Sequence, residues 1–164
     1  MCRDSPVTSL TPTGISILSV ITYVAEGVLS TSPHPSVPAG SAYVFLLTFD
    51  PPTLTSSPDP FGGLQYGFAS GSLTIAGATL SGNNLTISID DRTGEPDRMR
   101  IDGIGLSGDF SANVRFNFVG PETLFSSNDF PIPFPTLVDF PIVPQIVLNT
   151  STTNTGSVTV FQPQ

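Results

Sequence analysis

Lysine and tryptophan are absent from this sequence of 164 residues, and charged side chains of either sign are scarce. The 13 acidic residues are opposed by only five basic ones, all of them arginine, so the net charge is −8. Nucleic-acid binding needs clustered Lys and Arg to neutralise phosphates, and anionic membrane surfaces attract the same side chains. We therefore expect neither a nucleic acid nor an anionic membrane surface as a partner.

Cysteine and histidine each occur once, as Cys2 and His34. A single cysteine excludes an internal disulfide framework, and one Cys with one His cannot build a zinc site of clustered ligands. We interpret Cys2 as a residue without a specific role at the chain terminus. The sharper alternatives are a covalent link between two copies and a lipidated N-terminus.

The residue patterns of common catalytic sites are also missing. A Ser-His-Asp triad would have to use His34, which lies between Pro33 and Pro35 with no nucleophile-elbow motif nearby. No glycine motif is suited to cradle a phosphate, and no spacing nominates two carboxylates for glycoside hydrolysis. The sequence therefore predicts a protein that is not an enzyme and that carries no cofactor, calcium excepted.

Long apolar runs are missing too. No segment reaches the length of a membrane span, and no charged start precedes an apolar run as in a signal peptide. We expect no membrane span, and we expect any export signal to have been removed.

The sequence is rich instead in glycine, proline and uncharged polar residues, placed between short apolar stretches. With 15 glycines and 17 prolines, long helices have little room. Charged residues make up 11% and the mean hydropathy is +0.21, close to the opposite of a disordered composition. A surface covered mainly by Ser, Thr, Asn and Gly, without lysine, suits an extracellular or cell-surface location.

Residues 109–119 form the best-marked element. Five apolar residues alternate strictly with four polar ones, which places the two sets on opposite faces of a half-buried strand. Three phenylalanines on one face need a large apolar surface opposite them, so we expect a second layer. The apolar set is Phe110, Ala112, Val114, Phe116 and Phe118, and the polar set is Ser111, Asn113, Arg115 and Asn117.

Similar strand patterns recur along the chain at turn spacings of roughly 8–12 residues. They predict an all-β fold of about eight or nine strands, an antiparallel β-sandwich or jelly roll. Residues 1–14 are a lead-in, residues 15–164 are one domain, and residues 85–119 are an antiparallel meander. Residues 121–144 can hardly lie within a sheet, because each proline there removes a ladder donor. Strands are expected at residues 15–24, 41–49, 68–75, 78–80, 85–89, 98–106, 109–119, 146–148 and 158–161.

Acidic residues crowd one hairpin tip, where Gly94 marks the turn. Hard cations bind several oxygens in flexible geometry, so this tip is a candidate calcium site. The spacing is not that of an EF-hand, and three nearby arginines are able to neutralise the acids locally. A solvated, arginine-paired tip is therefore the competing interpretation. The candidate ligands are Asp90, Asp91, Glu95 and Asp97, and the arginines are Arg92, Arg98 and Arg100.

A second patch interleaves phenylalanine with proline over residues 125–140. It is either a loop that plugs the open end of the sandwich or a docking strip for a neighbouring subunit, since exposed apolar patches mark interfaces. The interface candidates are Phe125, Phe130, Phe134 and Phe140.

Short segments across residues 21–160 resemble the secreted bacterial proteins that carry a PEP-CTERM sorting tail. The resemblance does not extend to the tail, because the chain ends at Phe161-Gln-Pro-Gln without a Pro-Glu-Pro motif. It implies an exported β-domain of the surface or of the exopolysaccharide matrix and names no catalytic residue. The segments are Ile21-Thr-Tyr with Gly27, Phe49-Asp50, Ser57-Pro-Asp-Pro, Gly71-Ser-Leu-Thr-Ile, Leu106-Ser-Gly, Leu124-Phe-Ser-Ser-Asn-Asp, Pro135-Thr-Leu-Val-Asp-Phe and Gly156-Ser-Val-Thr.

Two hypotheses of function follow. The first is an extracellular or cell-surface structural subunit of a fibre, sheath or matrix, which self-associates through sheet edges and the Phe/Pro patch. Lysine is the commonest guard of exposed edges, and this chain has none. The alternative is a monomeric matrix module that binds polysaccharide or calcium. The absence of tryptophan weakens this alternative, because stacking on a sugar ring would have to use Tyr or Phe.

Overall fold

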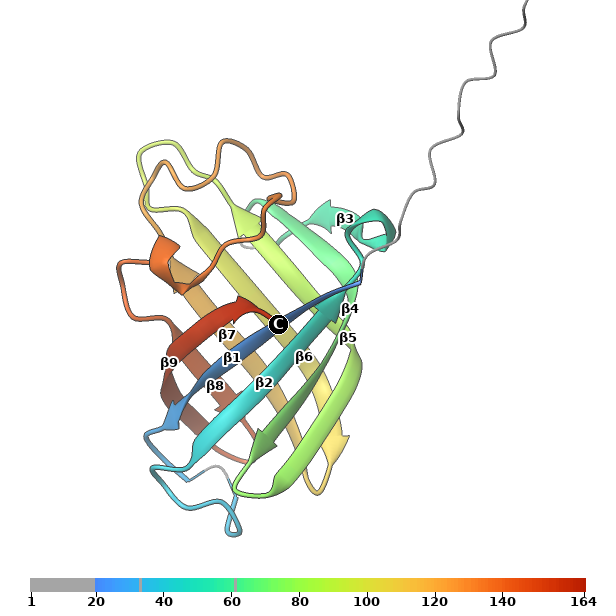
Figure 1. The fold of residues 1–164 in the computed structure, drawn as a ribbon, viewed down its shortest axis with the longest axis vertical. Helices are drawn as coiled ribbons and strands as arrows, with labels where there is room; N and C mark the ends of the chain where they lie inside the picture. Colours follow the sequence, from blue (N-terminus) through green and yellow to red (C-terminus); the bar gives the residue numbers. More distant parts are fainter. Residues whose placement is uncertain (1–19, 33, 61) are drawn as a thin grey trace, which may run out of the picture.

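The computed structural model describes residues 20–32, 34–60 and 62–164 (Figure 1). The interpretations of Cys2 and of the lead-in at residues 1–14 lie outside this range. So does the first half of the strand expected at residues 15–24.

The described residues form nine β-strands and two short 3-10 helices, η1 and η2, so the all-β prediction is confirmed. No helix among them is long and apolar enough to cross a membrane. In chain order the elements are β1 (Ile21–Leu29), β2 (Ala42–Phe49), η1 (Pro51–Thr53), β3 (Thr55–Pro58), β4 (Leu64–Ile75), β5 (Ala78–Asp90), β6 (Arg98–Gly108), β7 (Ser111–Val119), η2 (Leu137–Asp139), β8 (Gln145–Asn149) and β9 (Thr153–Pro163).

Eight of these strands close into one antiparallel barrel (Figure 1). Around the barrel the order is β1, β2, β4, β5, β6, β7, β8 and β9, and β9 pairs with β1 to complete the ring. Each strand therefore lies beside its neighbours along the chain, in an up-and-down arrangement. β3 lies outside the ring and pairs only with β4 among the described strands.

The predicted sandwich or jelly roll is therefore wrong, although the strand content is right. Alternation of apolar and polar residues indicates that one face of a strand is buried. The same alternation is found in a sheet that packs on another sheet and in a sheet that closes on itself. Closure also needs strands that bend and twist, which bulges provide. The register shifts between Glu26 and Gly27 in the β1–β9 pair, and between Gly103 and Leu106 in the β6–β7 pair.

Aromatic side chains fill the middle of the barrel around β7, the strand expected at residues 109–119. Phe116 and Phe118 are 0% and 1% exposed, so the predicted buried face is confirmed. The ring of Phe116 lies 4.7 Å from that of Phe45 and 6.2 Å from that of Tyr43. The expected layer opposite β7 is thus the far wall of the same barrel. The predicted meander is confirmed as well, because β5, β6 and β7 are consecutive antiparallel neighbours.

Residues 120–144, named here the plug loop, cover one end of the barrel (Figure 1). Phe125, Phe134 and Phe140 are buried in the core, and Phe130 is partly buried against it. The Phe134 ring lies 5.0 Å from the ring of Tyr23, whose hydroxyl donates a 2.7 Å hydrogen bond to the Phe134 carbonyl. The segment thus covers the end of a barrel, whereas the sequence suggested a plug at the open end of a sandwich. These four phenylalanines face inward, so the prediction that they form an exposed docking strip is wrong.

Candidate functional site

The acidic hairpin tip between β5 and β6 is neutralised by arginine. Asp90 accepts hydrogen bonds from Arg92, with Nε 2.9 Å from Oδ1 and Nη2 2.9 Å from Oδ2. Glu95 lies 3.4 Å from Arg92 and 4.0 Å from Arg98. The Asp91 backbone N–H donates to the side-chain oxygen of Asn128 at 2.7 Å. The tip therefore has the arginine-paired arrangement.

Asp97 departs from the other three acids, because it is completely buried under the plug loop. Its Oδ2 accepts the backbone N–H of Phe125 at 2.7 Å, and its carbonyl accepts that of Gly120 at 2.9 Å. Its Oδ1 is buried without a hydrogen-bond partner. Within the described ranges, no three His, Cys, Asp or Glu side chains form a group that could hold a metal ion. The four candidate ligands therefore do not converge on a calcium site.

The role of Asp97 in anchoring the plug loop leads to a prediction about pH. Burial raises the pKa of Asp97 above its ordinary value of 3.8, and the nearby Asp91 and Glu122 raise it further, although the Phe125 N–H opposes them. The folded protein therefore holds this proton more tightly than the unfolded chain. Its contribution to stability is present below pH 3.8 and is lost as the pH rises through the folded pKa.

We expect Asp97→Asn to become more stable relative to the parent as the pH rises from about 4 through the raised pKa of Asp97. The asparagine oxygen still accepts the Phe125 N–H, and the amide cannot ionise. Urea unfolding of both proteins across this range measures the difference. A difference that stays constant with pH would show that the buried carboxylate does not titrate as expected.

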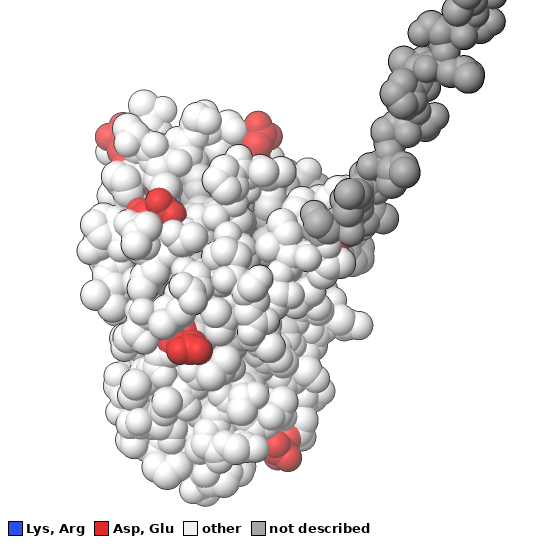
Figure 2. All heavy atoms as spheres, viewed as in Figure 1, with Lys and Arg blue, Asp and Glu red and all other residues white. Residues whose placement is uncertain are grey.

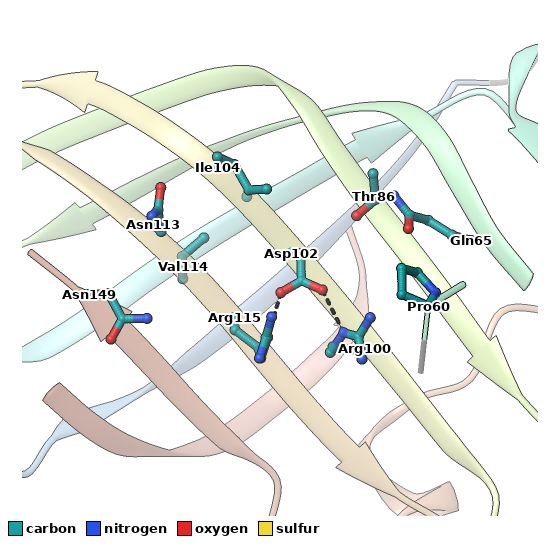
Figure 3. A pocket seen from close by; sticks show the side chains of 11 residues that line it. Pro60, Gln65, Thr86, Arg100, Asp102, Ile104, Asn113, Val114, Arg115 and Asn149 are labelled. Carbon is teal, nitrogen blue, oxygen red and sulfur yellow. Dashed lines mark hydrogen bonds and ion pairs between the residues drawn. The ribbon is translucent and has the colours of Figure 1, made fainter. Parts of the chain in front are cut away.

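A groove runs across the outer wall of the barrel from β4 to β8, and it is named here the outer groove (Figure 3). Its volume is about 300 Å³. Most of its lining comes from outward-facing residues of β4 to β8, because alternate residues of a strand point to the same face, and Pro60 of the β3–β4 connection and the buried Val114 complete it. The lining residues are Pro60, Gln65, Thr86, Arg100, Asp102, Gly103, Ile104, Asn113, Val114, Arg115 and Asn149.

Ion pairs fix the centre of the outer groove (Figure 3). Asp102 accepts hydrogen bonds from Nε of Arg100 and Nε of Arg115, both at 2.6 Å. Arg100 also donates to Asp59 at 2.7 Å, which ties the connection between β3 and β4 to the wall. Burial acts against the charge of Arg100, but the bonds to Asp102 and Asp59 outweigh it and raise the pKa of the guanidinium.

The sequence predicted that alternate residues of these strands face solvent, but it did not predict that they form the outer groove. Asn113 and Arg115 were expected on the solvent face of β7, and Arg100 was assigned to the acidic tip. In the strand register, Asp102 of β6 lies opposite Thr86 of β5 and Arg115 of β7. Polar side chains of three neighbouring strands therefore form one row across the wall. The length and type of each hairpin turn set this register. The turn residues in the sequence are therefore the signal from which the row could have been predicted.

His34 lies in a local turn of the β1–β2 connection. Its Nδ1 is 2.6 Å from the Ser36 hydroxyl and 3.3 Å from the Ser36 backbone nitrogen, two residues along the chain. Its ring stacks on Phe110 with the centroids 4.9 Å apart. Among the described residues, no carboxylate is hydrogen-bonded to the imidazole. The contact with Ser36 is therefore the closure of a turn.

Several strongly exposed apolar side chains belong to the plug loop. Val138 is 90% exposed, Val143 64% and Ile142 56%, all within six residues. These three are named here the apolar patch. Ile132, in the same loop, is 79% exposed. The plug loop thus has two faces, phenylalanine toward the core and branched aliphatic residues toward solvent.

No family model, no curated protein and no solved structure matches this chain. The resemblance to proteins with a PEP-CTERM tail therefore stays a prediction from the sequence. We infer function from the chain's own surfaces.

Proposed function

We propose that this protein is a non-enzymatic structural subunit of an extracellular or cell-surface matrix, and that copies associate through the apolar patch. The observation that carries the proposal is the exposure of Val138, Ile142 and Val143 on one short segment. Single exposed apolar residues are ordinary, but several on one loop, with Ile132 of the same loop also 79% exposed, favour contact with a partner.

The mode of association differs from pairing at open sheet edges. In the closed barrel, both edges of each of the eight strands are hydrogen-bonded to a neighbouring strand. A closed barrel therefore has no open sheet edge. β3 keeps one outer edge, but it is four residues long and ends at Pro58. A short edge with proline is a poor template for another strand. Association is therefore assigned to side chains of the plug loop.

Core packing and hydrogen bonds fix the segment of the plug loop that carries the apolar patch. Phe140, next to η2, is buried with its ring 4.9 Å from that of Phe118. At the start of η2, the backbone N–H of Thr136 donates to Asp139 at 2.7 Å, which completes a capping box. Holding Val138 in place before binding reduces the entropy that an interface has to overcome.

Charge acts against association, and its effect depends on salt. Figure 2 shows one face of the molecule, with scattered acidic groups and no basic one on an otherwise uncharged surface. Copies with a net charge of −8 repel each other at low ionic strength. The Debye length falls to about 8 Å at physiological ionic strength, so added salt weakens this repulsion. Salt is therefore expected to promote association rather than disrupt it.

We expect the double variant Val138→Asp/Ile142→Asp to remain monomeric where the parent associates. Light scattering coupled to size-exclusion chromatography, over a series of protein concentrations at low and high salt, measures the mass. The matched control is Val28→Asp/Val44→Asp, which adds the same charge to the barrel wall at residues that are 42% and 40% exposed. Melting curves verify that both variants are folded.

A parent that is monomeric at every concentration and salt level would contradict the proposal. So would a wall variant that loses association as fully as the patch variant, because charge alone would then be responsible.

A further inference from the structure

We propose that the outer groove binds an uncharged glycan, as a function separate from association through the apolar patch. The groove lies on the wall formed by β4 to β8, whereas the apolar patch lies on the plug loop. The two proposals therefore rest on different residues and can fail independently.

The charge balance of the outer groove selects a neutral ligand. Its two arginines are matched by Asp102 within the groove and by Asp59 at its border, at distances of 2.6 to 2.7 Å. A charged ligand would have to compete with these pairs, and an anion would also be repelled by the net charge of −8. The pairs are partly buried, since the side chain of Asp59 is 1% exposed and that of Arg100 is 19% exposed. Their effect here is to hold planar polar groups in fixed positions.

Hydrogen-bonding groups remain available around this fixed centre. The side chains of Gln65, Thr86 and Asn149 make no hydrogen bond with the rest of the described chain. Asn113 uses its oxygen to accept the Gly105 N–H at 2.7 Å, which leaves its NH₂ group for a ligand. Arg115 lines the groove and is bonded to Asp102 through Nε, which leaves its terminal nitrogens outside that bond.

Sugar hydroxyls fit this set of groups, because each hydroxyl both donates and accepts. Side-chain amides supply a donor and an acceptor in one plane, and a guanidinium supplies a fork of donors. Ile104, which is 69% exposed, and Pro60 add apolar surface at the groove, against which the C–H face of a sugar ring can lie. The wall carries no aromatic platform within the groove, so we expect weak binding to each site, with Kd on the order of 1 mM.

The competing explanation is that the ion pairs only tie the β3–β4 connection to the wall. A test must therefore leave Asp59, Arg100, Asp102 and Arg115 intact. The double variant Gln65→Ala/Asn149→Ala removes two groups that are outside the ion pairs and without internal hydrogen bonds. The matched control is Asn84→Ala/Gln145→Ala, which changes one residue on β5 and one on β8 outside the groove.

Affinity electrophoresis in native gels detects binding of this strength. The gels contain dextran, a mixed-linkage β-glucan or galactomannan as neutral polymers, or a polyuronate as an anionic one. We expect at least one neutral polymer to retard the parent and the control equally. The retardation should fall at least fivefold in the groove variant, and it should not change with salt.

Three outcomes would overturn the proposal: no retardation by any neutral polymer, equal retardation of the groove variant, or retardation by the polyuronate alone that disappears with salt. Melting temperatures of both variants within about 2 °C of the parent exclude unfolding as the cause. Light scattering of the groove variant should show unchanged association, which separates a failure here from a failure of the proposed structural role.

Discussion

Replacing Phe116 with alanine is expected to lower the free energy of unfolding by about 3–5 kcal/mol. Phe116 is 0% exposed at the centre of the barrel, and its ring contacts those of Phe45 and Tyr43. The loss combines the transfer free energy of the ring with the cavity that it leaves. The barrel wall is hydrogen-bonded all round, so it cannot collapse far into that cavity. For a domain of this size the melting temperature should fall by roughly 10 °C or more.

Asn117→Ala is the matched control for this experiment. Asn117 is the next residue of β7 and points to the outer wall, so its replacement should change stability by about 0.5 kcal/mol or less. Denaturant unfolding of both variants measures the difference. Similar losses in the two proteins would mean that the inward and outward faces of β7 are wrongly assigned.

Replacing Gly27 with alanine is expected to destabilise the seam where the first and last strands of the barrel meet, by about 3 kcal/mol. Gly27 lies at the register shift between β1 and β9. A Cβ there would overlap the backbone carbonyl oxygen of Ser157 and come within 2.7 Å of the Tyr43 hydroxyl. That hydroxyl donates a 2.9 Å hydrogen bond to the same carbonyl. A backbone atom cannot move aside as a flexible side chain would, so the strands must separate.

Gly67→Ala provides the comparison, because a Cβ at Gly67 on β4 meets only the Thr55 hydroxyl, at 3.8 Å. Its effect should be about 0.5 kcal/mol or less. Amide hydrogen exchange locates the damage: Gly27→Ala should speed exchange in β1 and β9 before the other strands. Equal exchange throughout the barrel, or equal stability of the two variants, would contradict the idea that the seam depends on this glycine.

The sequence by itself determined most of the local structure. Alternation at residues 109–119 identified Phe116 and Phe118 as core and Asn117 as surface. Proline at residues 121–144 correctly predicted a segment outside the sheet. Both inferences succeed because they depend on the period of a strand and on the missing N–H of proline, which act within a few residues.

The candidate sites depended more on partners that are distant in the sequence. Crowded acids suggested calcium, but Asp97 turned toward Phe125 in the plug loop and Asp90 paired with Arg92. The outer groove exists because Asp102 on β6 meets Arg115 on β7 and because Asp59 reaches Arg100 across the wall. Composition identified these charged residues without indicating which pairs would form.

Only the tertiary structure decided that the sheet closes. One buried face per strand is equally compatible with two stacked sheets and with a ring. The choice lies in the pairing of β1 with β9, which are far apart in the chain, and in the pairing of β2 with β4, which leaves β3 outside the ring. These pairings depend on the twist and bulges accumulated over the whole sheet, and no local pattern encodes them. The closed barrel has an open end, which the phenylalanines of the plug loop fill. The apolar patch and the outer groove remain on the surface, and they are the regions to which function is assigned in the proposals.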